Sequence, residues 1–334
     1  MNGKIALEEH FNLPEFNVPQ YVNPEIMREI SRRLLDVTTM RLAEMDAVGI
    51  DYSLQSLNAP GVQGEPDSRR AVARARQVND TLAEIVAASP ARYGGFATLP
   101  MQDPAAAAAE LYRCATQLGF PGVMLNGYQN VGDAATGWYY DHERFLPFWE
   151  RAEALGVPVY LHPRDPLPGN QGIYEGHPEL FGAVWTFTVE TATHALCLMT
   201  SGLFDRFPRL TVILGHLGET LPFNIWRINH HLSFMGDLIK FGKPLTHYLL
   251  HNFYVTTSGN FHTQTLNATL AELGADRVLF STDYPFESMR EAADWFDNAA
   301  ISQNDRVKIG HTNARRLFPG LPERIGRPAD TARA

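Results

Sequence analysis

Cysteine and clustered positive charge are both scarce in this chain of 334 residues. Its two cysteines, Cys114 and Cys197, are far apart and form no Cys-x-x-Cys pair, so neither a disulfide framework nor a thiolate metal site is indicated. Acidic residues outnumber basic ones, 37 against 28, and no Lys/Arg cluster interrupts the net charge of -9. Nucleic acid and anionic membrane surfaces are therefore not expected as partners.

Long apolar runs are also missing, so no segment is expected to span a bilayer. The first residues enter a strand pattern directly, without the basic and apolar regions of a signal peptide. With 45% hydrophobic and 19% charged residues, the chain can bury a large core, either as two domains or as one large α/β domain. We expect a soluble, cytoplasmic protein.

Short apolar runs do recur, at intervals that suit β-strands alternating with helices. The expected strands cover residues 4–9, 52–58, 93–100, 122–127, 157–163, 211–218, 253–259 and 277–283. Eight such alternations in one continuous chain predict a single (β/α)8 TIM barrel over residues 1–334. A doubly wound sheet is the alternative, but no glycine-rich phosphate turn follows the first strand.

The stretches between these runs carry signals for the start and the end of helices. Residues 103–119 begin with Asp103 as N-cap and Pro104 in the first turn, and Gly119 is expected to end the helix. Further helices are expected over residues 41–49, 67–90 and 145–156.

The stretch KIALEEHF, residues 4–11, opens with the first expected strand and breaks into Glu8, Glu9 and His10. Side chains alternate between the two faces of an extended chain, so Glu8 and His10 point the same way while Glu9 points the opposite way. Two ligand-capable groups on one face indicate a metal site, although two unrelated surface residues would give the same pattern.

Barrels of this kind place their chemistry at the carboxyl ends of their strands. Residue types that bind metals stand at four of the expected strand ends, namely Glu8 and His10, His162, His216 and Asp283. Singly, each has a structural explanation, such as helix capping by Asp283 or packing of His162 in the core. Together they predict a site for one divalent metal ion, and imidazoles with carboxylates suit Zn, Mn or Mg in different degrees.

Seven stretches spread over nearly the whole chain carry a family resemblance. They are GKIALEEHF, SLNAPGVQ (56–63), YLHPRDPLP (160–168), LGHLGETLPFNIWRI (214–228), TTSGNF (256–261), LFSTDYPFE (279–287) and VKIGHTNARRLF (307–318). Through them the chain resembles the amidohydrolase superfamily and, within it, the γ-resorcylate (2,6-dihydroxybenzoate) branch of the hydroxybenzoate decarboxylases. The resemblance implies an amidohydrolase-type barrel that assembles as a homotetramer or homodimer. It also implies the metal ligands Glu8, His10, His162 and Asp283, with His216 close by.

Two departures from the superfamily pattern bear on the metal count. Hydrolytic members usually open with His-x-His, and binuclear members often carry a carboxylated lysine at the end of strand four. This chain has Glu-x-His, and its fourth strand ends in Leu125, Asn126 and Gly127. We therefore expect one Zn or Mn ion per subunit, with Mg as an alternative, and no organic cofactor.

The resemblance implies reversible, non-oxidative decarboxylation of an ortho-hydroxybenzoate to the phenol and CO2. The candidate substrates are of the 2,6-dihydroxybenzoate, 2,3-dihydroxybenzoate or salicylate type. Their carboxylate and ortho hydroxyl can chelate one dication, and a proton must reach the carbon that bears the carboxylate. Asp283 is the candidate proton donor, and His216 and Glu219 are candidates for supplying its proton.

Other polar and aromatic residues are candidates for binding the substrate. Asn126 and Arg227 are expected to bind its oxygens, since the arginine fork suits a carboxylate. An ordinary ion pair on a helix surface is the alternative for Arg227. Phe11, Tyr21 and Phe286 are expected to wall the ring, unless they are core residues.

Two segments are expected to lie outside the regular barrel. Residues 12–35 form a longer connection than most, which suggests a lid or a subunit contact. Residues 319–334 are expected to be a loosely ordered tail.

Two other classes of function remain open. A metal hydrolase or lactonase acting on a cyclic carboxylate would use metal-bound water as its nucleophile. The Glu-x-His opening and the missing lysine argue against this class. A barrel that only binds a ligand is disfavoured by the concentration of ionisable groups at one face.

Overall fold

Eight parallel strands form the centre of the protein, in the order β1-β2-β3-β4-β7-β8-β9-β10. The computed structural model describes residues 1–16, 23–323 and 325. The strands are β1 (Lys4–Phe11), β2 (Ile50–Leu57), β3 (Tyr93–Ala97), β4 (Gly122–Asn126), β7 (Val159–His162), β8 (Val212–Leu214), β9 (Phe253–Thr256) and β10 (Val278–Leu279). A bridge between Glu9 and Tyr284 joins the first strand to the chain after the last one. This closure confirms the predicted TIM barrel.

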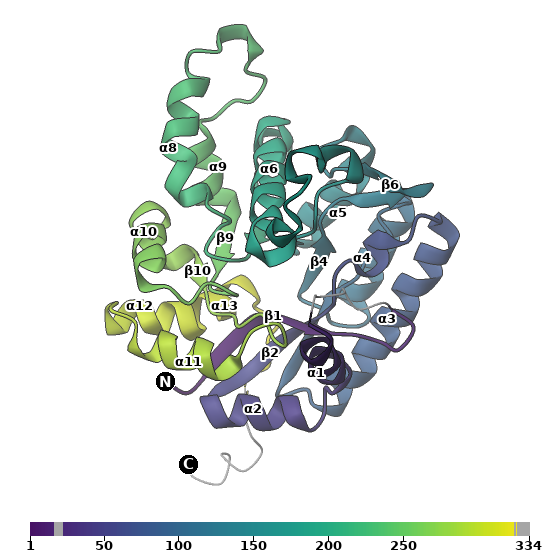
Figure 1. Cartoon of the computed structure of the whole chain (residues 1–334), viewed down its shortest axis with the longest axis vertical. Coiled ribbons are helices and arrows are strands. Elements are labelled where there is room, and N and C mark those ends of the chain that lie inside the picture. Colours follow the sequence, from purple (N-terminus) through teal and green to yellow (C-terminus); the bar gives the residue numbers. More distant parts are fainter. Residues whose placement is uncertain (17–22, 324, 326–334) are drawn as a thin grey trace.

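Helices connect the strands and surround them (Figure 1). They are α1 (Pro24–Leu35), α2 (Met40–Val48), α3 (Ser68–Ala88), α4 (Pro104–Thr116), α5 (Leu146–Leu155), α6 (Thr186–Thr200), α7 (Leu203–Arg206), α8 (Leu221–Leu232), α9 (Leu245–Asn252), α10 (Thr263–Leu273), α11 (Met289–Asn298), α12 (Gln303–Val307) and α13 (Asn313–Leu317). Helices α8 and α9 and their connection extend away from the barrel (Figure 1). Among the described residues, no helix is both long and apolar enough to cross a membrane.

Most of the predicted helix starts and ends are confirmed. The Asp103 side chain accepts hydrogen bonds from Ala105 and Ala106 at the start of α4. Helices α2 and α5 end at Gly49 and Gly156, both in the left-handed conformation that glycine adopts at low cost. The prediction for Gly119 was wrong, because α4 ends at Thr116 and its C-cap is Gln117.

Several strands are shorter than the sequence predicted, β8 and β10 most of all, and one hairpin was not predicted. Strand β8 stops at Leu214 and β10 at Leu279, because the chain beyond each of them leaves the extended conformation. The short strands β5 (Gln129–Val131) and β6 (Asp133–Trp138) form a separate antiparallel sheet after β4.

The hydrophobic core has two parts. The larger one contains Phe11 and Trp149 and includes buried residues from both strands and helices. The smaller one fills the inside of the barrel, because every strand of the large sheet contributes to it. Its strand residues are Ile5, Leu7, Tyr52, Leu54, Phe96, Met124, Tyr160, Ile213, Tyr254 and Leu279. This apolar filling places the polar residues of the barrel at the carboxyl ends of the strands.

Two regions that the sequence singled out lie partly outside the described residues. Residues 17–22, and with them Tyr21, belong to the segment 12–35, whose role as a lid or a subunit contact stays a prediction. The expected tail 319–334 is described only at 319–323 and 325.

Candidate metal centre

Four side chains from three parts of the barrel meet at the carboxyl ends of the strands. Glu8 and His10 come from β1, His162 from the end of β7, and Asp283 from the turn after β10. One ligand atom from each lies within 4.8 Å of the others. Nε2 of His10 is 3.3 Å from Oδ1 of Asp283, and Nε2 of His162 is 3.3 Å from Oε1 of Glu8. The structure thus brings together the four residues that the sequence proposed as metal ligands.

The atoms that face one another in this cluster lack hydrogen-bond partners. Oε1 of Glu8 and Nε2 of His10 are both buried and unpaired. The other nitrogen of each imidazole is held: Nδ1 of His10 lies 3.1 Å from the Ser56 hydroxyl, and Nδ1 of His162 lies 2.9 Å from the Pro163 carbonyl. Outer partners of this kind orient histidine ligands in metal sites. The donor set therefore fits one divalent cation.

Glu8 is oriented by hydroxyl groups inside the barrel. Tyr160 and Ser258 both donate hydrogen bonds to its Oε2. Thr256 lies between them, 2.8 Å from the Tyr160 hydroxyl and 2.9 Å from that of Ser258. A side chain at Gly215 would bring its Cβ within 2.9 Å of Oε2 of Glu8, so glycine is required there. These contacts leave Oε1 as the free oxygen.

Left-handed backbone is concentrated beside the cluster. Among the described residues, the non-glycine positions with positive φ are His216, Leu217, Glu219, Thr220 and Asp283, with φ between 53° and 69°. All of them follow β8 or β10. Such conformations are costly and gather at functional sites. At Asp283 the backbone N–H donates to the Glu8 carbonyl over 3.0 Å, which ties this turn to β1.

His216 lies between two carboxylates. Its Nδ1 is 2.6 Å from Oε1 of Glu219, and its Nε2 is 3.6 Å from Oδ2 of Asp283. The second oxygen of Glu219 accepts a hydrogen bond of 2.9 Å from Thr188. His216 therefore connects a buried carboxylate to the metal cluster, and this arrangement can pass a proton.

Burial and neighbouring charges shift the protonation of these groups. Burial alone would raise the pKa of Asp283, but the close contacts and charges of His10 and His216 outweigh it and hold that pKa below its ordinary value. Burial lowers the pKa of His216, yet Glu219, Glu8 and Asp283 together raise it well above its ordinary value. Burial, helped by the charge of His10, lowers the pKa of His162. A neutral His162 and an ionised Asp283 are the forms that bind metals.

A small cavity opens beside the cluster. It is lined by Asn58, Ala59, His162, Pro163, Ala183, Phe187, His216, Asp283, Phe286 and Glu287. The Phe286 ring lies 5.7 Å from the His10 ring. Burial and the nearby charge of Asp283 raise the pKa of Glu287 to about 7. A mostly apolar space next to converging polar groups is typical of a small-molecule site.

The predicted substrate-binding residues divide into two groups. Phe286 lines the cavity, and Asn126 is buried opposite His162 in the register of β4 and β7, with its Oδ1 unpaired. Phe11 is fully buried in the larger core cluster instead, on the opposite face of β1 from His10. Arg227 is exposed on α8 and does not line the cavity. Within one chain, the structure therefore places Phe11 and Arg227 away from the site.

Three residues of the site had no predicted role. Tyr160 and Ser258 hold Glu8, and Glu287 lines the cavity. Period-two alternation could have found Tyr160, because it lies two residues before His162 on the same strand. Asp283 does not cap the following helix, since Ser288 caps α11.

Comparisons with known proteins agree with this geometry. The amidohydrolase family model matches residues 20–320. A gamma-resorcylate decarboxylase from Rhizobium sp. (strain MTP-10005) is 52% identical over 322 residues, which cover 95% of this chain and 98% of that protein. A crystal structure of 2,6-dihydroxybenzoate decarboxylase complexed with 2,6-dihydroxybenzoate is 52% identical, with a TM-score of 0.93 over 96% of this chain and 99% of that one.

A further crystal structure is that of dihydroxybenzoic acid decarboxylase from Polaromonas sp. JS666, with bound manganese and the inhibitor 2-nitroresorcinol. It is 51% identical, with a TM-score of 0.92 over 96% of this chain and 97% of that one. The chain belongs to the amidohydrolase family and, within it, to the hydroxybenzoate decarboxylases.

Proposed function

We propose that this protein is a metal-dependent decarboxylase that converts an ortho-hydroxybenzoate to the phenol and CO2, reversibly and without oxidation. 2,6-Dihydroxybenzoate is the first candidate substrate, since two similar proteins are named for it. The observation that carries the proposal is the cluster of Glu8, His10, His162 and Asp283 beside the pair of His216 and Glu219.

The four clustered residues would hold one divalent metal ion, with Mn or Zn as candidates and Mg as an alternative. Its charge would fix the carboxylate and the ortho hydroxyl of the substrate and so hold the ring rigidly. Phe286 and Phe187 line the cavity and offer apolar surface to that ring.

Asp283 is proposed to deliver the proton to the ring carbon that bears the carboxylate. When that carbon–hydrogen bond has formed, the bond to the carboxylate breaks, its electron pair returns to the ring, and CO2 leaves. Asp283 is ionised beside His10 and His216, so it must first gain a proton. His216 is 3.6 Å away and is itself held by Glu219, which makes this pair the proposed supplier.

A metal-dependent hydrolase or lactonase is the competing function. The structure has Leu125 and Asn126, and no lysine, at the end of β4, so a second metal of the carboxylated-lysine type is not supported. The two functions differ in the atom transferred. In heavy water a decarboxylase leaves one deuterium on the ring carbon, whereas a hydrolase adds solvent oxygen.

A small panel of acids tests the proposal directly. The manganese-loaded protein should release CO2 from 2,6-dihydroxybenzoate, 2,3-dihydroxybenzoate or salicylate, and should leave benzoate and 4-hydroxybenzoate unchanged because these cannot chelate. Comparable turnover of 4-hydroxybenzoate would contradict the chelation argument. If no ortho-hydroxybenzoate releases CO2 but a lactone or amide ring is opened, the hydrolase function is the correct one.

Assembly into a homodimer or homotetramer is also proposed, and helix α8 is the surface that supports it. Phe223 and Trp226 on this helix are 85% and 70% exposed, and Phe234, Met235 and Leu238 follow them in the exposed connection. Monomeric proteins rarely expose so many large apolar side chains together. Arg227 stands among them, so it would bind substrate only in the site of a neighbouring subunit. A cytoplasmic location stays a prediction.

A further inference from the structure

Glu287 is a carboxylate that the proposed reaction does not use, although it lines the cavity beside the metal cluster. Its position is fixed by the turn after β10. The Asp283 carbonyl accepts hydrogen bonds from the backbone N–H groups of Phe286, at 2.9 Å, and Glu287, at 3.1 Å. Helix α11, capped by Ser288, begins directly after it. Glu287 is therefore tied to a metal ligand on one side and to a helix on the other.

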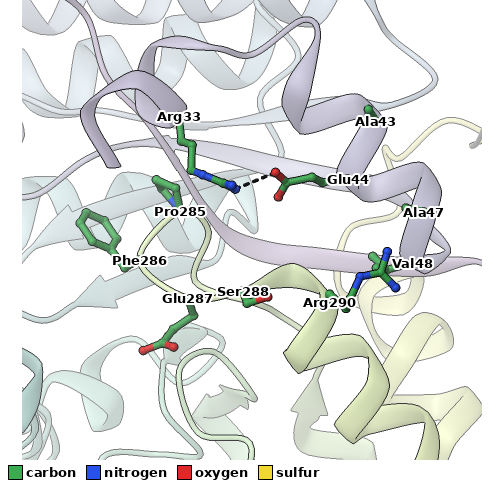
Figure 2. A pocket seen from close by; sticks show the side chains of 10 residues that line it. All are labelled: Arg33, Ala43, Glu44, Ala47, Val48, Pro285, Phe286, Glu287, Ser288 and Arg290. Atoms are coloured by element: carbon green, nitrogen blue, oxygen red, sulfur yellow. Dashed lines mark hydrogen bonds and ion pairs between the residues drawn. The ribbon is translucent and has the colours of Figure 1, made fainter. Parts of the chain in front are cut away.

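The carboxylate of Glu287 is available for a ligand in the part of the chain that the structure describes. Within the described residues its side chain makes no hydrogen bond and no ion pair, although the side chain is partly buried. It also lines a second hollow of about 540 Å³ between α1, α2 and residues 285–290. Figure 2 shows its carboxylate turned away from the Arg33–Glu44 ion pair in that hollow. A partly buried carboxylate without a protein partner is available to accept a hydrogen bond from a ligand.

Most of the other polar groups of the cavity are already engaged. His162 and Asp283 belong to the metal cluster, and His216 is held by Glu219. The Asn58 amide donates to the Ala59 carbonyl over 2.9 Å. The remaining lining residues are Ala59, Pro163, Ala183, Phe187 and Phe286, which are all apolar. A hydroxyl that enters this space away from the metal cluster meets two acceptors among the lining residues, the Glu287 carboxylate and the Asn58 amide oxygen, and the carboxylate is the stronger of the two.

We propose that Glu287 accepts a hydrogen bond from the second ring hydroxyl of the substrate, the one that does not chelate the metal. This contact would make Glu287 the residue that selects 2,6-dihydroxybenzoate over salicylate, which lacks that hydroxyl. The inference rests on the proposed decarboxylase function. It holds for either protonation state, because a carboxyl group keeps an acceptor oxygen when it is neutral.

Three variants test this role. Glu287→Leu removes the acceptor, and Glu287→Gln keeps an acceptor oxygen at the same reach. Glu291→Leu removes an exposed carboxylate in the first turn of α11 and is the matched control. For each, kcat/KM is measured with 2,6-dihydroxybenzoate and with salicylate, and bound manganese is determined.

The preference for 2,6-dihydroxybenzoate over salicylate should fall about 10- to 100-fold in Glu287→Leu, which is the range for a lost hydrogen bond to a charged group. Most of the preference should remain in Glu287→Gln, and all of it in Glu291→Leu. An unchanged preference in a manganese-loaded Glu287→Leu would overturn the inference. So would an equal loss of kcat/KM with both substrates, because this would show a structural role.

The wild-type protein gives a second test that needs no variant. 2-Fluoro-6-hydroxybenzoate keeps the chelating pair and is no larger than 2,6-dihydroxybenzoate, but it has no second donor. It should react as poorly as salicylate. Turnover equal to that of 2,6-dihydroxybenzoate would overturn the role of Glu287 while leaving the decarboxylase function intact. Release of CO2 from none of these acids would instead show that the proposed function itself is wrong.

Discussion

The hydroxyl of Tyr160 donates a hydrogen bond to Oε2 of Glu8 inside the barrel. Ser258 donates to the same oxygen, and the other oxygen of Glu8 faces Nε2 of His162 at 3.3 Å. The orientation of one proposed metal ligand is therefore set by a tyrosine that contributes no ligand atom itself.

Tyr160→Phe should weaken metal binding without unfolding the barrel, because the ring still fills its place in the inner core. Loss of such an outer partner typically lowers metal affinity about 10- to 100-fold. A manganese titration of the metal-free protein measures the change. Tyr248→Phe is the matched control, since Tyr248 is also buried and donates to a carboxylate, that of Asp205, on a different helix. Equal affinity in the two variants would remove Tyr160 from the support of the site.

His162→Ala should lose both the metal and the activity, because it removes one of the four converging ligands. Metal analysis of the purified variant and its rate of CO2 release are the measurements. His177→Ala, at an exposed histidine that pairs with Glu179, should keep both. An inactive His162→Ala protein that still holds about one metal ion per chain would show that His162 is not a ligand.

His216→Asn should keep the metal but lose rate, because His216 contacts the ligand Asp283 at 3.6 Å without belonging to the metal cluster. General acid–base groups contribute about 100- to 10,000-fold in rate, and a loss in this range is expected. The residual product formed in heavy water should still carry one deuterium. Loss of the metal in this variant would instead identify His216 as a ligand.

The sequence could predict the pair of Glu8 and His10 because strand geometry places both on one face, whereas the full set of four residues was implied by the family resemblance. Alternation in KIALEEHF puts Glu8 and His10 on one side, and the structure has Glu9 on the other, where it accepts hydrogen bonds from Thr282. The same rule, applied to the next residue, would have predicted that the Phe11 side chain points away from the site.

Other features depend on contacts that no local pattern reveals. The chain after β10 leaves the sheet because the backbone N–H of Asp283 bonds to the Glu8 carbonyl, which is distant in sequence. Alternation places Tyr160 on the same face as His162, but only the fold brings its hydroxyl to Glu8. The exposure of Arg227 follows from how α8 projects from the barrel, which its own sequence does not determine (Figure 1).

A last prediction concerns His194, a histidine far from this chemistry. It is buried in α6, and its Nε2 accepts a hydrogen bond of 3.0 Å from the backbone of Tyr140. Burial lowers its pKa from 6.5 to about 3. Between these two values the unfolded chain binds more protons than the folded one. The stabilising contribution of the neutral imidazole is therefore fully present above pH 6.5 and is lost as the pH falls toward 3.

The free energy of unfolding should accordingly decrease by about 1.5 kcal/mol from this group alone between pH 6.5 and 5. Carboxylates also titrate in this pH range. The informative quantity is therefore the difference in the free energy of unfolding between the wild-type protein and a His194→Gln variant. Glutamine can accept the same hydrogen bond from Tyr140 but does not titrate, so its stability should decline less steeply with acid. Urea unfolding of both manganese-loaded proteins at several pH values measures how the free energy of unfolding depends on pH. If the free energy of unfolding fell equally steeply with acid in both proteins, the imidazole of His194 would be charged, or solvated, in the folded protein.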